Sequence, residues 1–335
     1  MAKQKVRLQD IAEKTGYGTN TVSLAMRGST RISAAAREKI LKAAIELDYI
    51  PNHIAKSLAS RRSNTVGLIL HEITNPILTS VAEKIQLALA ARGYGVLFAT
   101  SNGNFEEELR AIEMFRSRMV DGLLIYPLEH SNLEHLKRLR DQSFPVVLLV
   151  GTRDTGIDAV GIDEYTGAYD ATWHLIERGH RRIGAIFPPD FETRSKYFGY
   201  TAALGAAGIA VDPLMVGTFP DHSIRGGIEA TAKIMHVPDA PTAIFASSDV
   251  LALGVLRWAS LHSRNVPEDL AIIGFDGVES ARYAMRALST INTDVDELAN
   301  CSVARLMELI DANGTLPAPC ASLLRGHLIV RESTA

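Results

Sequence analysis

The chain has 335 residues, of which 47% are hydrophobic and 22% are charged, and it contains neither a run of about 18 apolar residues nor an apolar signal-peptide core at its N-terminus. This composition excludes a disordered or membrane-spanning chain and predicts a cytoplasmic globular protein of roughly two or three domains. Residues 1–62 hold 12 Lys and Arg against 5 Asp and Glu, and the remainder holds 23 against 33, so a segment of charge +7 precedes a body of charge -10. Such an asymmetry indicates that the first segment meets a polyanion and the body does not, although a basic terminus is also common as a solvated face.

The first fifty residues have the pattern of a helix-turn-helix. LQDIAEKTG and YGTNTVSLAMRGS are two short helical patterns joined at Gly16, and Ser33 is placed to cap a third helix. The apolar positions that supply one small core are Leu8, Ile11, Ala12, Val22, Ala25, Ile40, Ala43 and Leu47. A generic three-helix bundle has a similar pattern and stays an alternative at this point.

The second of these helices carries short polar side chains along one face. Thr19, Asn20, Thr21 and Ser23 are donors or acceptors that can reach base edges or phosphates in a major groove. Leu24, at the far end of the same face, can offer only an apolar contact, for instance to a thymine methyl group. We expect these residues to read DNA.

From residue 65 the pattern changes to alternating strands and helices. The apolar segments TVGLIL, YGVLFAT, DGLLIYP and FPVVLLV come first, and RRIGAIFP, TAIFASS and LAIIGFD follow, with helical stretches between them. This alternation predicts two α/β lobes, each a doubly wound parallel sheet. Loops at the carboxyl ends of both sheets are then expected to face a cleft, the usual ligand position in this architecture.

The chain lacks the motifs that indicate an enzyme. It contains no Walker loop, no GxGxxG after a strand, no HExxH and no GxSxG elbow. Its two cysteines, Cys301 and Cys320, lie far from any His-rich or CxxC pattern. We therefore expect no catalytic residue, no cofactor, no metal site and no disulfide.

A set of strings in the chain resembles, in the same order, the lactose-repressor (LacI/GalR) family of bacterial transcription regulators. The strings are LQDIAEKTGYGTNTVSLAMRGS, REKILKAAIELDYIPNHIAKSLAS, ITNP, DGLLIYP, LIERGHRRIG, SSDVLALG, IIGFDG and LSTINTD, and the resemblance covers residues 6–331. It implies a helix-turn-helix head at 1–50, a hinge helix at 51–62, and an effector-binding and dimerisation domain of periplasmic-binding-protein type at 63–335. We place one lobe of that domain at 63–163 plus 293–322 and the other at 164–292 plus 323–335.

The resemblance also assigns roles in the segment that follows the head. It starts a short hinge helix at Asn52, places Ala55 on DNA, and makes Leu58 and its dimer mate an apolar wedge in the minor groove. A helix as short as NHIAKSLAS is marginal by itself, so its stability must come from a partner. The alternative is that Leu58 packs against the first lobe.

Matching positions to the effector contacts of the family marks a set of residues in the body: His71, Tyr126, Lys196, His222, Ser248, Asp276 and Thr293. Lys196 stands where the family usually has arginine, which replaces a planar fork with a point charge, and His222 stands where it has an aromatic residue. The set favours a small polyhydroxylated effector, a sugar or sugar derivative, either neutral or acidic. Structural explanations stay open, because Asp249 fits a helix N-cap and Asp276 fits a turn before Gly277.

The sequence thus predicts a homodimeric DNA-binding transcription regulator, a repressor, whose operator affinity is controlled by a small effector. One alternative is a regulator of the same family that has lost its ligand response. A secreted solute-binding protein is disfavoured, because it would share the body but would not carry the head.

Overall fold

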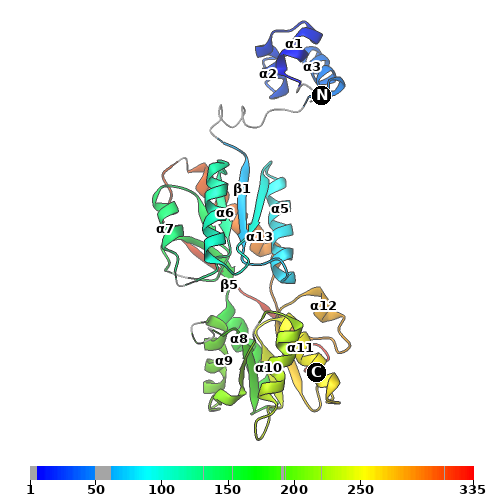
Figure 1. Ribbon diagram of the computed structural model, residues 1–335, viewed down its shortest axis with the longest axis vertical. Coiled ribbons are helices and arrows are strands. Elements are labelled where there is room, and N and C mark those ends of the chain that lie inside the picture. Colours follow the sequence, from blue (N-terminus) through cyan, green and yellow to red (C-terminus); the bar gives the residue numbers. More distant parts are fainter. Residues whose placement is uncertain are drawn as a thin grey trace. The chain divides into compact units, whose positions relative to one another are not determined.

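The computed structural model describes residues 6–49, 62–130, 132–152, 154–189, 192, 194–219, 221–312 and 314–335. The chain forms two compact units, Met1–Ser63 and Asn64–Ala335 (Figure 1). Most of the predicted hinge helix, including Asn52, Ala55 and Leu58, lies outside the described residues. Within the described part, no helix is both long enough and apolar enough to cross a bilayer.

The first unit is a bundle of three short helices: α1 (Leu8–Thr15), α2 (Thr19–Met26) and α3 (Ala34–Glu46). Gly16 ends α1 with a φ of 76°, the left-handed conformation that glycine adopts without strain. Ser33 caps α3, because its hydroxyl accepts a hydrogen bond from the backbone N–H of Ala36. The buried core consists of Ile11, Ala12, Val22, Ala25, Ile40, Ala43 and Ala44, with Leu8 and Leu47 partly buried at its edge. The predicted helix-turn-helix head is confirmed.

The first lobe of the second unit is a parallel sheet covered by helices on both faces. Its strand order is β11-β5-β4-β3-β1-β2, and every pair of neighbours is parallel. The strands are β1 (Thr65–Leu70), β2 (Gly95–Thr100), β3 (Gly122–Ile125), β4 (Val146–Leu148), β5 (Asp158–Ile162) and β11 (Ala321–Leu324). The helices are α5 (Pro76–Ala90), α6 (Phe105–Ser117), α7 (Glu134–Asp141) and α13 (Val295–Asp311).

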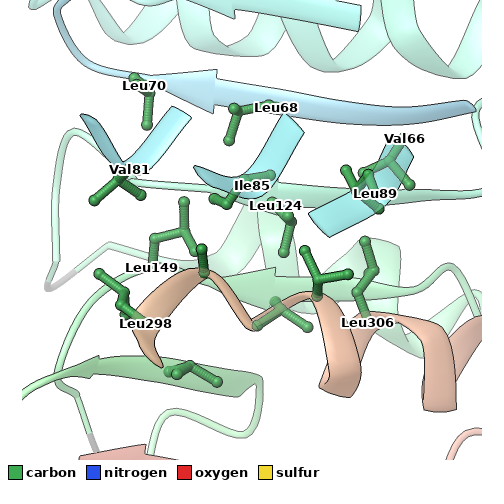
Figure 2. Close-up of a cluster of buried hydrophobic side chains, with 14 of the residues drawn as sticks. Val66, Leu68, Leu70, Val81, Ile85, Leu89, Leu124, Leu149, Leu298 and Leu306 are labelled. Carbon is green, nitrogen blue, oxygen red and sulfur yellow. The ribbon is translucent and has the colours of Figure 1, made fainter. Parts of the chain in front are cut away.

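One face of this sheet is buried beneath α5 and α13 (Figure 2). The side chains in the cluster come from β1, α5, β3, β4 with the residue that follows it, β5 and α13, and they include Val66, Leu68, Leu70, Val81, Ile85, Leu89, Leu124, Leu149, Leu298 and Leu306. Ile69 belongs to the cluster on the opposite face, with Phe115 of α6, because successive side chains of a strand point to opposite faces. A strand that is buried on both faces has a continuous apolar sequence, which explains why TVGLIL is readily recognised as a strand.

The second lobe repeats this architecture with the strand order β12-β10-β9-β8-β6-β7, in which only β12 is antiparallel to its neighbour. The strands are β6 (Ile183–Phe187), β7 (Val216–Thr218), β8 (Ala243–Ala246), β9 (Ala271–Asp276), β10 (Ser289–Asn292) and β12 (His327–Ile329). The helices are α8 (Glu164–Glu177), α9 (Ser195–Ala206), α10 (Ile224–Ile234), α11 (Asp249–Leu261), the short α12 (Glu279–Arg282) and the 3-10 turn η2 (Pro213–Met215). The core that includes α8 and α9 is separate from the core that includes α10 and α11. The prediction of two doubly wound lobes is confirmed, with an antiparallel strand at one edge.

Three connections carry the described chain from one sheet to the other: after β5, after β10, and between β11 and β12. β11 runs to Leu324, so the first lobe includes two residues beyond the predicted limit of 322.

The apolar pattern does not pick out β5, β7, β10, β11 or β12, because these strands are short and mix apolar with polar or small residues.

Candidate functional site

The predicted effector residues come from the strand ends and helix starts of both lobes. His71 directly follows β1 and Tyr126 directly follows β3, whereas Asp276 ends β9 and Thr293 follows β10. The carboxyl ends of parallel strands meet at one edge of their sheet, which is the usual ligand-binding edge. The remaining members are Lys196 in the first turn of α9, His222 just ahead of α10, and Ser248 just ahead of α11.

Glu72 links the two lobes at this edge, although it was absent from the predicted set. Its Oε1 lies 3.5 Å from Nδ1 of His222 in the second lobe and 3.6 Å from Nε2 of His71 in its own lobe. The hydroxyl of Thr74 donates to Oε2 at 3.0 Å. The contacts with His222 and His71 hold the pKa of the Glu72 carboxyl well below its usual range. Glu72 is therefore an ionised carboxylate shared between the lobes, and its place directly after His71 was the available sequence signal.

Contacts made by Ile77 and Arg194 also join the lobes. Ile77, near the start of α5, packs against the hydrophobic cores of both lobes. Nη1 of Arg194 in the second lobe lies 3.2 Å from Nδ1 of His130 in the first. Apolar, charged and aromatic groups thus all contribute to the junction, which we call the inter-lobe site.

Aromatic rings line the first-lobe side of the inter-lobe site. The ring of Tyr126 lies 4.8 Å from that of His71 and 5.5 Å from that of His130, measured between centroids. Burial of the phenol raises the pKa of Tyr126, and the negative charge of Glu164 adds to this effect. Tyr126 therefore keeps its proton and can act as a hydrogen-bond donor as well as an acceptor.

Lys196, the predicted partner for an acidic group, already has partners within the protein. Its ammonium donates to the backbone carbonyl of Ser247 at 3.0 Å and lies 3.4 Å from a carboxylate oxygen of Glu164. It also lies 4.0 Å from the centroid of the Phe275 ring, within the range of a cation–π contact. An anionic ligand at Lys196 would have to compete with these groups.

His222 and Ser248 form a hydrogen-bonded pair in the second lobe. Nε2 of His222 lies 2.8 Å from the hydroxyl of Ser248, which also accepts from the backbone N–H of Leu251 and so caps α11. The N-cap is thus Ser248, and Asp249 is the first residue of the helix. The structural explanation that treated Asp249 as a cap is wrong by one residue.

Asp249 instead supports the backbone around Asp276. Asp276 has a φ of 107° and Gly277 a φ of 80°, and a positive φ is uncommon for a residue with a side chain. Oδ2 of Asp249 accepts hydrogen bonds from the backbone N–H groups of Gly277 and Val278, each at 2.8 Å. On the other side, the hydroxyl of Thr293 donates to the Asp276 carbonyl at 2.9 Å. The Thr293 side chain therefore serves this backbone conformation.

The Asp276 carboxylate is an unusual acceptor. The residue is only 9% exposed, and burial raises the pKa of its carboxyl to about 6, against the opposing charges of Lys196 and His222. Burial also raises the pKa of Asp249 to about 8. Among the described residues, none donates a hydrogen bond to the Asp276 carboxylate, whereas Asp249 has several donors. The lone pairs of the Asp276 carboxylate are therefore available to a donor from outside the chain.

The predicted DNA-reading residues lie in α2 of the first unit. Thr19 and Asn20 are exposed, and Thr21, Ser23 and Leu24 are partly buried. The buried members of the helix are Val22 and Ala25, which pack into the three-helix core. The helix thus has one face in the core and leaves its short polar residues accessible.

No group of three or more His, Cys, Asp or Glu among the described residues has an arrangement that could hold a metal ion.

Comparisons with known proteins match both parts of the chain. The profile of bacterial regulatory proteins of the lacI family matches residues 7–52, and that of the periplasmic binding protein-like domain matches residues 172–334. The transcriptional repressor CytR of Escherichia coli (strain K12) is 31% identical over 332 residues, which cover 98% of this chain and 96% of CytR. The transcriptional regulator CelR of Thermobifida fusca is 32% identical over 344 residues, which cover 99% of both chains.

Solved structures give the same result. The lac repressor dimer bound to operator and the anti-inducer ONPF matches with a TM-score of 0.89 at 25% identity and covers 99% of both chains. A complex of CelR with cellobiose matches with a TM-score of 0.73 at 30% identity and covers 98% of this chain and 100% of CelR. The chain therefore belongs to the LacI family of bacterial regulatory proteins, and it is a DNA-binding transcription regulator, not an enzyme.

Proposed function

We propose that this regulator is a cytoplasmic repressor that binds operator DNA as a homodimer and is controlled by a small effector at the inter-lobe site. The observation that carries the proposal is the contact of Glu72 in one lobe with His222 in the other. A molecule that binds Glu72 or His222 in place of the other residue changes how the lobes meet. Lobe closure then becomes the quantity that the effector controls.

The DNA interface of the proposal consists of the face of α2 with Thr19, Asn20, Thr21, Ser23 and Leu24, followed by Asn52, Ala55 and Leu58. The charge of +7 over residues 1–62 supports binding to phosphates, because Lys and Arg release counterions from DNA. The accessible polar residues of α2 support the reading of base edges.

The effector of the proposal is a small polyhydroxylated molecule, a sugar or sugar derivative. The carboxylates of Glu72 and Asp276 can accept from hydroxyl groups, and the neighbouring rings of His71 and Tyr126 offer flat surfaces to the apolar face of a sugar ring. The complex of a relative, CelR, with cellobiose supports the class of ligand.

A homodimer is supported by large apolar side chains that stay exposed on the second unit. Leu87 of α5 is 53% exposed, and Phe98 of the edge strand β2 is 45% exposed. Tyr283 and Met285, which follow α12, are 71% and 95% exposed. Phe, Tyr and Met are enriched at protein–protein interfaces. The matched lac repressor structure is itself a dimer.

The test uses the full chain. Genomic fragments that it retains are footprinted to define an operator, and operator affinity is then measured with and without a panel of sugars. We expect a protected site with two-fold symmetry and a sugar that changes the affinity by at least about tenfold. A protected site whose affinity no sugar changes would favour the family member that has lost its ligand response. The absence of any protected site would contradict the proposal as a whole.

A further inference from the structure

The charges at the inter-lobe site are unequally available to a ligand. The carboxylates are those of Glu72, Glu164 and Asp276, and the cations are Lys196 and Arg194. All three carboxylates act on Tyr126, since each of them raises its pKa while Arg194 lowers it. A ligand that contacts Tyr126 therefore also meets the electrostatic field of these carboxylates.

Both cations are already engaged by the protein. The Lys196 ammonium has the Ser247 carbonyl at 3.0 Å, Glu164 at 3.4 Å and the Phe275 ring at 4.0 Å. The Arg194 guanidinium lies 3.2 Å from His130. An acidic ligand would have to displace these partners and would at the same time approach three carboxylates, which repel it at short range.

The carboxylates of Asp276 and Glu72 are less tightly engaged, although Oε2 of Glu72 accepts a hydrogen bond from Thr74 at 3.0 Å. Asp276 is 91% buried, and none of the described residues donates a hydrogen bond to its carboxylate. Glu72 is held at 3.5 and 3.6 Å by two histidines, distances that are long for hydrogen bonds. A ligand ammonium can make shorter, charge-assisted bonds to Glu72 than these rings make.

We propose that the inter-lobe site selects an effector that carries an ammonium group as well as hydroxyls, of the amino-sugar class, and that Glu72 is the residue that determines this specificity. The inference rests on the proposed effector control. The ammonium binds Oε1 of Glu72 and takes the place of His222, while the hydroxyls donate to Asp276. The effector thereby replaces the direct contact between the lobes with a contact through itself, and the same residue serves both recognition and response.

The test compares sugars of one parent skeleton that carry no charge, an ammonium group at C2 or a carboxylate at C6. Glucose, glucosamine and glucuronate, together with the corresponding galactose series, are titrated calorimetrically into the full chain at a pH that keeps the amines protonated. We expect the amino sugar of at least one series to bind about tenfold or more tightly than its neutral parent, a difference of about 1.4 kcal/mol, and the acid to bind most weakly.

Two variants separate the role of Glu72 from a general effect of charge. Glu72→Gln keeps the shape of the side chain and removes its charge, and we expect it to bring the affinities of the amino and neutral sugars within about twofold of each other. Glu83→Gln makes the same change at an exposed position of α5 in the same lobe, and we expect it to keep the preference. Operator binding by both variants shows that they are folded.

The outcomes are distinct. Tightest binding by an acidic sugar, equal binding of amino and neutral sugars by the unmodified chain, or a preference retained in Glu72→Gln overturns the inference. In each of these cases a bound sugar that alters operator affinity leaves the proposed function standing. Failure of every sugar to bind overturns the inference and, if operator affinity also never changes, the proposed effector control with it.

Discussion

The carboxylate of Asp249 accepts a hydrogen bond at 2.8 Å from the backbone N–H of Gly277, the residue that follows Asp276. It also accepts from the N–H of Val278 and the hydroxyl of Thr290, and Asp249 is fully buried. Asp249→Ala leaves these donors without an acceptor, so we expect the free energy of unfolding to fall by about 2 to 4 kcal/mol. Urea unfolding of the full chain measures this difference.

Asp249→Asn is the matched variant for this test. Its amide oxygen can still accept from both backbone N–H groups, and its amide nitrogen can donate to Thr290, so we expect it to keep most of the stability that the alanine variant loses. Equal stability of the alanine variant and the unmodified chain would show that the carboxylate does not support the loop.

Stability should depend on pH through Asp276. Burial raises the pKa of its carboxyl from the ordinary 3.8 to about 6 in the folded protein. The folded state therefore binds the proton more tightly than the unfolded state does. Protonation of Asp276 therefore adds to the free energy of unfolding. This contribution is complete below the ordinary pKa and is lost as the pH rises through about 6, a change on the order of 2 to 3 kcal/mol.

We expect Asp276→Asn to remove that part of the pH dependence. The measurement is the free energy of unfolding of both proteins at several values between about pH 4 and pH 7. The difference between them should favour the asparagine variant increasingly as the pH rises. Parallel curves would contradict a raised pKa at Asp276.

Asp158 binds the C-terminal segment around Cys320 to the first lobe through hydrogen bonds. Its Oδ1 accepts from Nε of Arg305 at 2.8 Å and from the backbone N–H of Cys320 at 3.1 Å, and its Oδ2 accepts from Arg140 at 3.2 Å. Asp158 is fully buried, so Asp158→Ala leaves two arginines without their shared anion. We expect a loss of about 3 to 5 kcal/mol in the free energy of unfolding, measured in urea.

Asp170→Ala provides the contrast for this prediction. Asp170 pairs with Arg325 at 3.2 Å, but the arginine side chain is 67% exposed. Removal of this surface pair should change stability by less than about 1 kcal/mol. Similar losses from both substitutions would mean that the buried network of Asp158 contributes no more to stability than the surface pair does.

Asn20 is the clearest residue with which to test base reading. It is exposed near the start of α2, and an asparagine amide can pair with two groups on the edge of adenine. We expect Asn20→Ala to lose about 1 to 3 kcal/mol of binding energy at the operator and little on random DNA. The measurement is operator and random-sequence affinity at one salt concentration, and equal losses on both DNAs would exclude base reading.

Leu58, outside the described residues, is the predicted minor-groove wedge. Leu58→Ala should weaken operator binding and reduce DNA bending, because an apolar wedge unstacks a base step and kinks the duplex. Gel phasing measures the bend, while sedimentation checks that the variant stays dimeric. An unchanged bend would return Leu58 to the alternative of packing against the first lobe.

Long apolar strands and capped helices were predictable from the sequence, whereas the partners of the site residues were not. TVGLIL is recognisable because β1 is buried on both faces, and Ser33 because a cap depends on residues three positions apart. Lys196 shows the limit. Its carbonyl partner belongs to Ser247, which follows β8, and its carboxylate partner is Glu164 at the start of α8. Both are far away along the chain, so only the tertiary structure, in which α8 packs beside α9, reveals that the ammonium is engaged.

Glu72 was missed for a related physical reason. A glutamate after a strand is usually solvated, and nothing in the neighbouring residues indicates that a histidine 150 positions later will lie beside it. Asp276 was found through the family resemblance, but its burial and its positive φ are properties of the folded chain. The chemistry of the site therefore follows from tertiary structure even where its residue types can be guessed.

The three connections between the lobes constrain how the gene can change. Each lobe is encoded in two separate stretches, because α13 and β11 of the first lobe come after most of the second, and β12 returns to the second lobe at the end. A stop codon after β10 would therefore damage both lobes at once. Recombination between related genes would need to replace two distant stretches to exchange one whole lobe, so single crossovers produce hybrid lobes whose sheets combine strands from two parents.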